Sequence, residues 1–173
     1  MGLATFIGGI HPYEGKELSE DKPIQFIVPE KGEEMVYPLS QHIGAPAKPL
    51  VAKGDQVLKG QIIAEAGGFI SANVLSSVSG TVKGIESKLV ANGAMVQSIL
   101  VENDGEEEAI EGFGTDRDAT KLSKEEIRKI VKDAGIVGLG GAGFPTHVKL
   151  TPKDENAIDY VIVNGAECEP YLT

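Results

Sequence analysis

Glycine and proline interrupt the first hundred residues so often that no long helix fits there. The whole chain has 22 glycines and nine prolines in 173 residues. Between these breaks lie short β-branched runs at 24–28, 61–64 and 99–101, which predict strands bounded by turns. The first half is therefore predicted to fold as a small all-β module.

An internal repeat supports this prediction. Residues 51–57 match residues 90–96 at Val, Ala, Gly and Val, and residues 62–65 then match 99–102 after a two-residue offset. Each copy predicts a strand, a glycine turn and a return strand. The two copies could face each other about a pseudo-twofold axis.

The pattern V-x-x-G-D-x-V-x-x-G-Q-x-I-A at 51–64, followed by S-G-T-V at 79–82, resembles the β module of biotinyl and lipoyl carrier domains. A carrier needs a lysine at the tip between its halves, because the lysine amine forms the amide to the prosthetic group. No lysine occurs from 65 to 82, and Lys59 and Lys83 lie outside the expected tip. We therefore expect a barrel-sandwich hybrid without carrier activity.

The negative charge is concentrated in the second part of the chain. Residues 1–100 have a net charge of −2 and residues 101–173 of −8, with eight acids and one arginine in 102–118. Such a run repels itself and has little to bury, which is typical of a solvated linker, although an acidic docking patch is the alternative. The predicted domains are 1–101, a β module, and 119–173, the incomplete start of an α/β nucleotide- or flavin-binding domain, with 102–118 as linker. The fold class is α+β overall.

Composition excludes several classes of protein. A net charge of −10 argues against a nucleic-acid binder, which usually shows a basic stripe. No apolar run approaches the roughly 18 residues of a membrane span, and the first residues lack the basic and apolar regions of a secretory signal. The single cysteine, Cys168, allows no internal disulfide, which fits a reducing cytoplasm.

The histidine in the Gly/Pro-flanked loop 39–46, His42, has no cysteine or acid at metal-ligand spacing. A hydrogen bond within a turn is the favoured interpretation, with a metal or catalytic role as the alternative.

The second half opens with a helix that its caps define. Ser123 and Glu126 fit a capping box, in which each side chain bonds the other residue's free backbone N–H. Apolar residues then recur at helical spacing, and Gly135 is the expected left-handed stop. The apolar positions are Ile127, Ile130, Val131 and Ala134.

A glycine-rich segment follows, and residues 138–143 literally satisfy G-x-G-x-x-G. A dinucleotide-binding fingerprint requires a strand before the motif and a helix starting within it, whereas here a helix precedes it and Pro145 interrupts it. Glycines still let backbone N–H groups approach an anion or a flat ring, and Lys149 could pair with a phosphate. The alternative is a flexible turn.

A short apolar run at 160–163 predicts a buried strand, which leads into Asn164, Glu167 and Glu169. Ligands gather at the carboxyl ends of strands in parallel sheets, where these side chains would offer an amide and two carboxylates. Cys168 is expected to be a small buried side chain, with a role as ligand or nucleophile as the alternative.

These motifs carry a resemblance. GLGGAGFPTHVKL (138–150) and VIVNGAECEP (161–170) are similar to the flavin-binding region of the C subunit of the Rnf electron-transport complex, and to the related flavoprotein subunit of respiratory NADH dehydrogenase. GGIHP (8–12), LSQHIGAP (39–46), KGDQVLKGQ (53–61) and SVSGTV (77–82) resemble the Rnf protein specifically.

The resemblance implies roles for individual residues. Gly138, Gly140, Gly141 and Lys149 would surround the phosphate and ribityl chain of FMN, and Asn164 and Glu167 would contact the flavin. Glu169 would lie near the isoalloxazine and the incoming nicotinamide, as the catalytic carboxylate. Three positions depart from the dehydrogenase pattern: His147 replaces a glycine, Leu150 a tryptophan and Ala166 an aspartate.

The resemblance also implies a function. Members of this family pass electrons between NAD(H) and ferredoxin through FMN and two [4Fe-4S] clusters, coupled to Na⁺ or H⁺ translocation by membrane partners. One cysteine cannot hold a cluster that needs about four thiolates, so we expect no cluster here and a chain that is an N-terminal piece, inactive alone. The implied partners are other Rnf subunits and ferredoxin-linked carriers, at the cytoplasmic face of the membrane. The alternative function is a non-catalytic assembly module.

Overall fold

The computed structural model describes residues 13, 15–18, 20–139 and 141–163. The chain divides into two units, Val28–Glu155 and a second that combines Met1–Ile27 with Asn156–Thr173. The elements, in chain order, are η1 (Lys16–Leu18), β1 (Glu34–Pro38), β2 (Lys48–Pro49), β3 (Gln56–Val57), β4 (Ile62–Glu65), β5 (Val74–Leu75), β6 (Gly80–Leu89), β7 (Met95–Asn103), η2 (Ala119–Lys121), α1 (Lys124–Asp133), α2 (Thr146–Lys149) and η3 (Glu155–Ala157).

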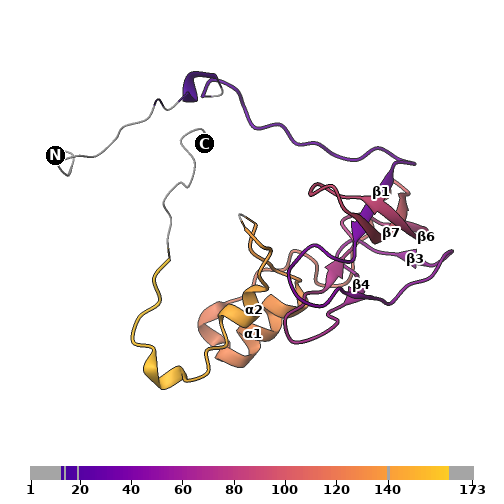
Figure 1. Cartoon of the computed structure of the whole chain (residues 1–173). Helices are drawn as coiled ribbons and strands as arrows, with labels where there is room; N and C mark the ends of the chain where they lie inside the picture. The colour runs from indigo at the N-terminus through magenta and orange to yellow at the C-terminus, as the bar shows by residue number, and fades with distance from the viewer. Residues whose placement is uncertain (1–12, 14, 19, 140, 164–173) are drawn as a thin grey trace. The chain divides into compact units, whose positions relative to one another are not determined.

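Two small antiparallel sheets form the β module. The larger has the order β1-β7-β6-β3, and the smaller has the order β2-β4-β5. The long strands β6 and β7 pair from Gly80↔Asn103 to Leu89↔Met95, and β1 adds to the other edge of β7 (Figure 1). Residues 34–103 thus contain strands and turns but no helix, as the glycine and proline pattern predicts, and the 3-10 helix η1 lies before them.

The core lies where the two sheets face each other. Ile63 of β4 and Ile99 and Val101 of β7 are completely buried, and Val57 and Val82 are only 1% exposed. These residues come from both sheets and belong to one apolar cluster. Since strands of two to four residues are marginal alone, this shared core is what holds the short strands in place.

The internal repeat is visible at its turns. Gly54 and Gly93 occupy equivalent turns with positive φ, at +96° and +83°. The copies then diverge, because the first is divided between β3 in one sheet and β4 in the other, whereas the second continues as the single strand β7. The pseudo-twofold axis stays a prediction.

The predicted helix is confirmed as α1. The Ser123 hydroxyl accepts from the Glu126 N–H at 3.2 Å, and the Glu126 carboxylate accepts from the Ser123 N–H at 2.8 Å, so the capping box is complete. Ala134 caps the C-terminus, and Gly135 follows with a φ of +64°. Both boundaries follow from local residues alone.

Replacing Ser123 by alanine should lower the free energy of unfolding by about 1 kcal/mol, because the Glu126 N–H at the start of α1 loses the hydroxyl that accepts its hydrogen bond. Urea unfolding of Ser123→Ala measures the loss. Ser123→Asp is the matched control, since aspartate also accepts at this position and should retain most of the stability. Equal stability of the alanine and aspartate variants would contradict the prediction.

The first part of the acidic segment lies along the β module. Glu102 and Asn103 belong to β7, and the backbone of Lys59 bonds on both sides of Ala109, donating to the Glu108 carbonyl and accepting from the Ile110 N–H. Of residues 102–118, all but Asn103 and Asp104 are exposed, so the run has little to bury, as predicted. Backbone hydrogen bonds nevertheless hold its first part, residues 102–110, along the β module. The limits 1–101, 102–118 and 119–173 stay a prediction.

Two predicted strands are wrong. Residues 24–28 and 160–163 are not in strands, and Phe26 and Ile162 are 94% and 90% exposed. β-branched composition favours extended backbone, but a strand also needs a neighbour that accepts its hydrogen bonds. Within the described residues, no strand pairs with either run. The other two runs are confirmed: β4 includes residues 62–64 of the first, and β7 includes all of 99–101.

Candidate functional site

The glycine-rich segment forms a closed loop between α1 and α2. Val137 and Pro145 make an antiparallel bridge at its base, and the Gly138 N–H donates to the Phe144 carbonyl at 3.0 Å. The Thr146 N–H donates to the Ile136 carbonyl at 2.9 Å, which closes the base from outside. Residues 138–144, the glycine loop, thus have a defined base, and α2 begins directly after it.

The glycine loop and the end of α2 bring two predicted site residues together. A Cβ built on Gly138 would lie 3.2 Å from the Lys149 Nζ, so the ammonium lies directly beside the backbone of this glycine. A Cβ on Gly141 would meet no atom within 4 Å. The loop therefore offers open backbone next to a cation, a combination that suits an anionic group.

Lys149 is available for such a group. Its side chain is exposed, and none of the ion pairs among the described residues involves it. Two of the three lysines of α1 differ, since Lys124 and Lys129 pair with Glu155 and Asp133. A lysine bound to a carboxylate would have to exchange partners before it held a phosphate, whereas Lys149 has no carboxylate of the described residues to release.

A cavity of about 680 Å³ opens beside the glycine loop. One wall is the loop itself, and the other comes from the β module, from residues 38 and 40–43 and from the β6–β7 turn at 90–92. This volume lies within the range of about 300 to 1,000 Å³ that small-molecule and cofactor sites occupy. The residues present thus fit the phosphate end of a mononucleotide, with glycine backbone in the cavity wall and the Lys149 ammonium beside Gly138, although Lys149 does not itself line the cavity.

His147 lies on α2 but does not add a positive charge to the site. Only 9% of its surface is exposed. Burial lowers the pKa of His147, and the charge of Lys132 lowers the pKa further, against a hydrogen bond with the Phe69 backbone that raises it. The histidine therefore stays neutral near pH 7 and anchors α2 to the β module. That contact is a physical reason for a histidine where the dehydrogenase pattern has glycine.

The remaining predicted residues are outside the described part of the chain: Gly140, Asn164, Glu167, Glu169, and also Cys168 and Ala166. The run at 160–163 that was to carry the second loop is exposed and is not a strand. The structure thus describes the phosphate half of the predicted site, and the flavin-ring half stays a prediction.

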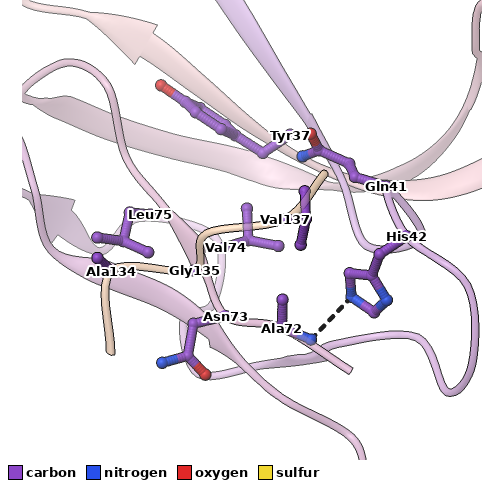
Figure 2. A pocket seen from close by; sticks show the side chains of 10 residues that line it. All are labelled: Tyr37, Gln41, His42, Ala72, Asn73, Val74, Leu75, Ala134, Gly135 and Val137. Atoms are coloured by element: carbon purple, nitrogen blue, oxygen red, sulfur yellow. Dashed lines mark hydrogen bonds between the residues drawn. The ribbon is translucent and has the colours of Figure 1, made fainter. Parts of the chain in front are cut away.

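The β-module wall of the site was missed by sequence reasoning. Gln41 and His42 line the cavity, yet they lie about a hundred residues before the glycine loop. A second, smaller cavity of about 330 Å³ lies between the same residues, residues 72–75, which include β5, and residues 134–135, which follow α1 (Figure 2). LSQHIGAP was visible as a motif, but nothing local indicated what it contacts.

His42 is hydrogen bonded, as the sequence favoured, but only its bond to Ile43 is local, because Ala72 lies 30 residues further along the chain. Its Nε2 accepts from the Ala72 N–H at 3.1 Å (Figure 2), and its Nδ1 lies 3.0 Å from the Ile43 carbonyl oxygen. In the described part of the chain, no group of three or more His, Cys, Asp or Glu residues could hold a metal ion. Nor does that part contain a helix long and apolar enough to cross a bilayer.

Comparison with known families identifies both halves. Residues 4–106 match the RnfC barrel sandwich hybrid domain, and residues 131–173 match the Nuo51 FMN-binding domain. The first match covers more than half of the chain and confirms the predicted fold class of the β module. The second match begins within α1 and includes the whole glycine loop.

Curated relatives agree with these matches. The chain is 46% identical over 172 residues to the C subunit of a proton-translocating ferredoxin:NAD(+) oxidoreductase complex of Clostridium ljungdahlii, covering 99% of this chain and 37% of the relative. It is 47% identical to the C subunit of the Na(+)-translocating complex of Acetobacterium woodii, covering 98% of this chain and 38% of the relative. It is 42% identical to the C subunit of an ion-translocating oxidoreductase complex of Rhodobacter capsulatus, covering 96% of this chain and 32% of the relative. The chain spans well under half the length of these relatives.

Proposed function

This chain belongs to the RnfC family, and from that membership we propose that it supplies the β module and the FMN phosphate loop of an ion-translocating NAD:ferredoxin oxidoreductase complex. The observation that carries the FMN assignment is the position of the Lys149 Nζ beside Gly138, next to the open backbone of Gly141. The match of residues 131–173 to an FMN-binding domain supports the same assignment.

In this proposal Gly138, Gly140, Gly141 and Lys149 hold the phosphate and ribityl chain. Asn164 and Glu167 contact the flavin, and Glu169 is the catalytic carboxylate facing the nicotinamide. When bound, FMN supplies the conversion between two-electron hydride transfer and one-electron steps. The protein's own work is to bind the phosphate, to orient the ring and to keep the reacting carboxylate in place.

The proposal also covers the complex as a whole. NAD(H) is the hydride partner, and two [4Fe-4S] clusters carry the electrons onward, held by residues other than those of this chain. Its single cysteine cannot supply the four or so thiolates that one cluster takes. The partners are the other subunits of the Rnf complex and ferredoxin-linked carriers, at the cytoplasmic face of the membrane, with Na⁺ or H⁺ as the coupling ion.

Replacing Lys149 by alanine should raise the dissociation constant for FMN about 10- to 100-fold, because the phosphate loses a charge-assisted contact. Quenching of flavin fluorescence on titration measures this in the whole gene product that carries this sequence, purified without oxygen. Lys153→Ala is the matched control, since it removes the same charge from an exposed lysine four residues further on and should leave the affinity unchanged. Unchanged affinity in Lys149→Ala would remove the phosphate assignment.

The second candidate function is a non-catalytic assembly module. It is favoured by the β module's own core, which is built by β3, β4, β6 and β7 and needs no cofactor to close. The visible absorption spectrum separates the two. A flavin double band supports the oxidoreductase proposal, whereas a gene product that stays colourless after reconstitution with FMN and iron–sulfur components leaves docking as the function.

A further inference from the structure

The turn that would carry a prosthetic group in a carrier domain is tied down in this protein. Residues 66–73, the tip turn, bond inward at several points. The Gly67 N–H donates to the Ser71 hydroxyl at 2.8 Å, and that hydroxyl donates to the Ala45 carbonyl at 2.8 Å. The Ala45 N–H in turn donates to the Ile70 carbonyl at 3.0 Å. The tip turn is therefore a fixed surface and not a swinging arm.

The end of α1 rests on the tip turn. The last carbonyls of a helix have no partner inside the helix. The Asn73 amide donates to two of them, those of Lys132 and Asp133, at 3.4 Å each. The backbones of Asn73 and Gly135 are in close contact: a Cβ on Gly135 would lie 2.4 Å from the Asn73 carbonyl oxygen. Asn73 thus holds the end of α1, and with it the start of the glycine loop, against the tip turn.

The glycine loop itself rests on the segment around His42. The Ile43 N–H donates to the Ala142 carbonyl at 3.0 Å, and a Cβ on Gly143 would lie 2.7 Å from the Gln41 carbonyl oxygen. Since a backbone N–H can only donate, the Ala72 N–H obliges the His42 Nε2 to accept, which leaves the ring hydrogen on Nδ1 for the Ile43 carbonyl. His42 therefore joins the tip turn to the segment that contacts the loop.

The cation of the site depends on the same support. The Arg128 Nε on α1 donates to the Leu150 carbonyl at the end of α2, at 2.6 Å. Lys149 precedes that carbonyl by one residue. A displacement of α1 would therefore also move Lys149. A displacement of residues 41–43 would move the glycine loop.

From these contacts we infer that Asn73 and His42 are positioning residues for the glycine loop, which we propose binds the FMN phosphate. The tip turn supports the glycine loop and Lys149 and fixes their positions relative to each other. The inference rests on the proposed FMN function. It assigns to the β module a part in cofactor binding, through residues that do not touch the cofactor.

The test compares Asn73→Asp with Asn103→Asp. Asn73→Asp keeps an oxygen for the Ala66 N–H but places a carboxylate against the carbonyl end of α1, which the helix dipole also disfavours. Asn103 has the same chemistry elsewhere: its amide donates to the Pro29 and Glu30 carbonyls, and its oxygen accepts from the Gly105 N–H. Both variants remove one amide from two carbonyls, so a general loss of stability affects both.

Two readouts are taken on the whole gene product, hydrogen exchange without flavin and FMN affinity. We expect the amides of Ile43, Gly138 and Thr146 to exchange about 10-fold faster in Asn73→Asp than in Asn103→Asp. We expect FMN affinity to fall about 10-fold or more in Asn73→Asp alone, since small displacements of a preorganised site are costly.

A second pair of variants keeps the inference testable if Asn73→Asp does not fold. Gly143→Ala puts a methyl group against the Gln41 carbonyl at a φ of +63°, whereas Gly114→Ala puts one into open space at a φ of +71°. The backbone strain is thus matched, and only Gly143→Ala should weaken FMN binding and speed exchange in the loop.

The outcomes separate the inference from the proposed function. If hydrogen exchange in the glycine loop is unchanged in Asn73→Asp and Gly143→Ala, the tip turn does not support the loop, whatever the FMN affinity. Faster exchange with unchanged FMN affinity overturns the positioning role. If the unaltered protein binds no FMN, the proposed function fails and takes the role toward the phosphate with it, while the exchange data still decide whether the tip turn holds the loop.

Discussion

Replacing Gly80 by alanine is expected to lower the free energy of unfolding by about 3 kcal/mol or more. Gly80 opens β6 and pairs with Asn103 of β7. A Cβ at this position would lie 2.0 Å from the Glu102 carbonyl oxygen and 2.9 Å from its carbon. These are backbone atoms of the neighbouring strand, so no side chain can rotate away to relieve the overlap.

A methyl group at position 80 would also disturb the core, because it forces β6 and β7 apart close to their buried residues. Val82 and Val101 are cross-strand partners two positions further along, and both are 1% exposed or less. For a chain of this length, a loss of this size corresponds to a fall in the melting temperature of about 10 °C. Thermal and urea unfolding of the 173-residue chain measure both quantities.

Gly68→Ala is the control for this prediction. A Cβ there would have only the Ala45 methyl group within reach, at an ordinary contact distance of 3.4 Å, and the residue is exposed. The change should stay within about 0.5 kcal/mol. Similar stabilities of Gly80→Ala and Gly68→Ala would mean that β6 and β7 can separate at this point without cost, contrary to their close packing.

Local signals predicted the parts of the fold that depend on neighbours in sequence. The capping box at Ser123 and the stop at Gly135 define α1 because each acts within one turn of the helix. Gly138 and Lys149 could be placed in one site because they belong to one short motif. The runs at 24–28 and 160–163 could not be judged in this way, since a strand exists only where another strand pairs with it.

The wall of the site illustrates what sequence reasoning could not reach. The contact between the Gln41 carbonyl and Gly143 joins residues about a hundred positions apart, and its chemistry is that of backbone against backbone. No residue type signals such a contact. The missing lysine of the tip turn excluded a carrier, but what replaced the cargo is visible only in the contact of Asn73 with the end of α1.

Among the substitutions proposed, the largest effect on cofactor binding is expected at Gly141. A Cβ there would meet no atom within 4 Å, so this position can accept a side chain without disturbing the loop. Gly141→Glu would place a carboxylate where we propose the FMN phosphate, and two unit charges about 4 Å apart repel by about 4 kcal/mol at an effective dielectric of about 20. Exposure and salt reduce this repulsion, so we expect affinity for FMN to fall about 100-fold.

Gly141→Gln is the control that isolates charge, because it adds almost the same volume without the carboxylate. It should weaken FMN binding only through the space that it fills, well short of the loss in Gly141→Glu. Calorimetric titration at low and at high salt measures the difference, which should shrink as salt screens the repulsion. Equal losses in the two variants, independent of salt, would show that the loop excludes bulk but does not face an anion. The phosphate would then have to be sought away from Lys149.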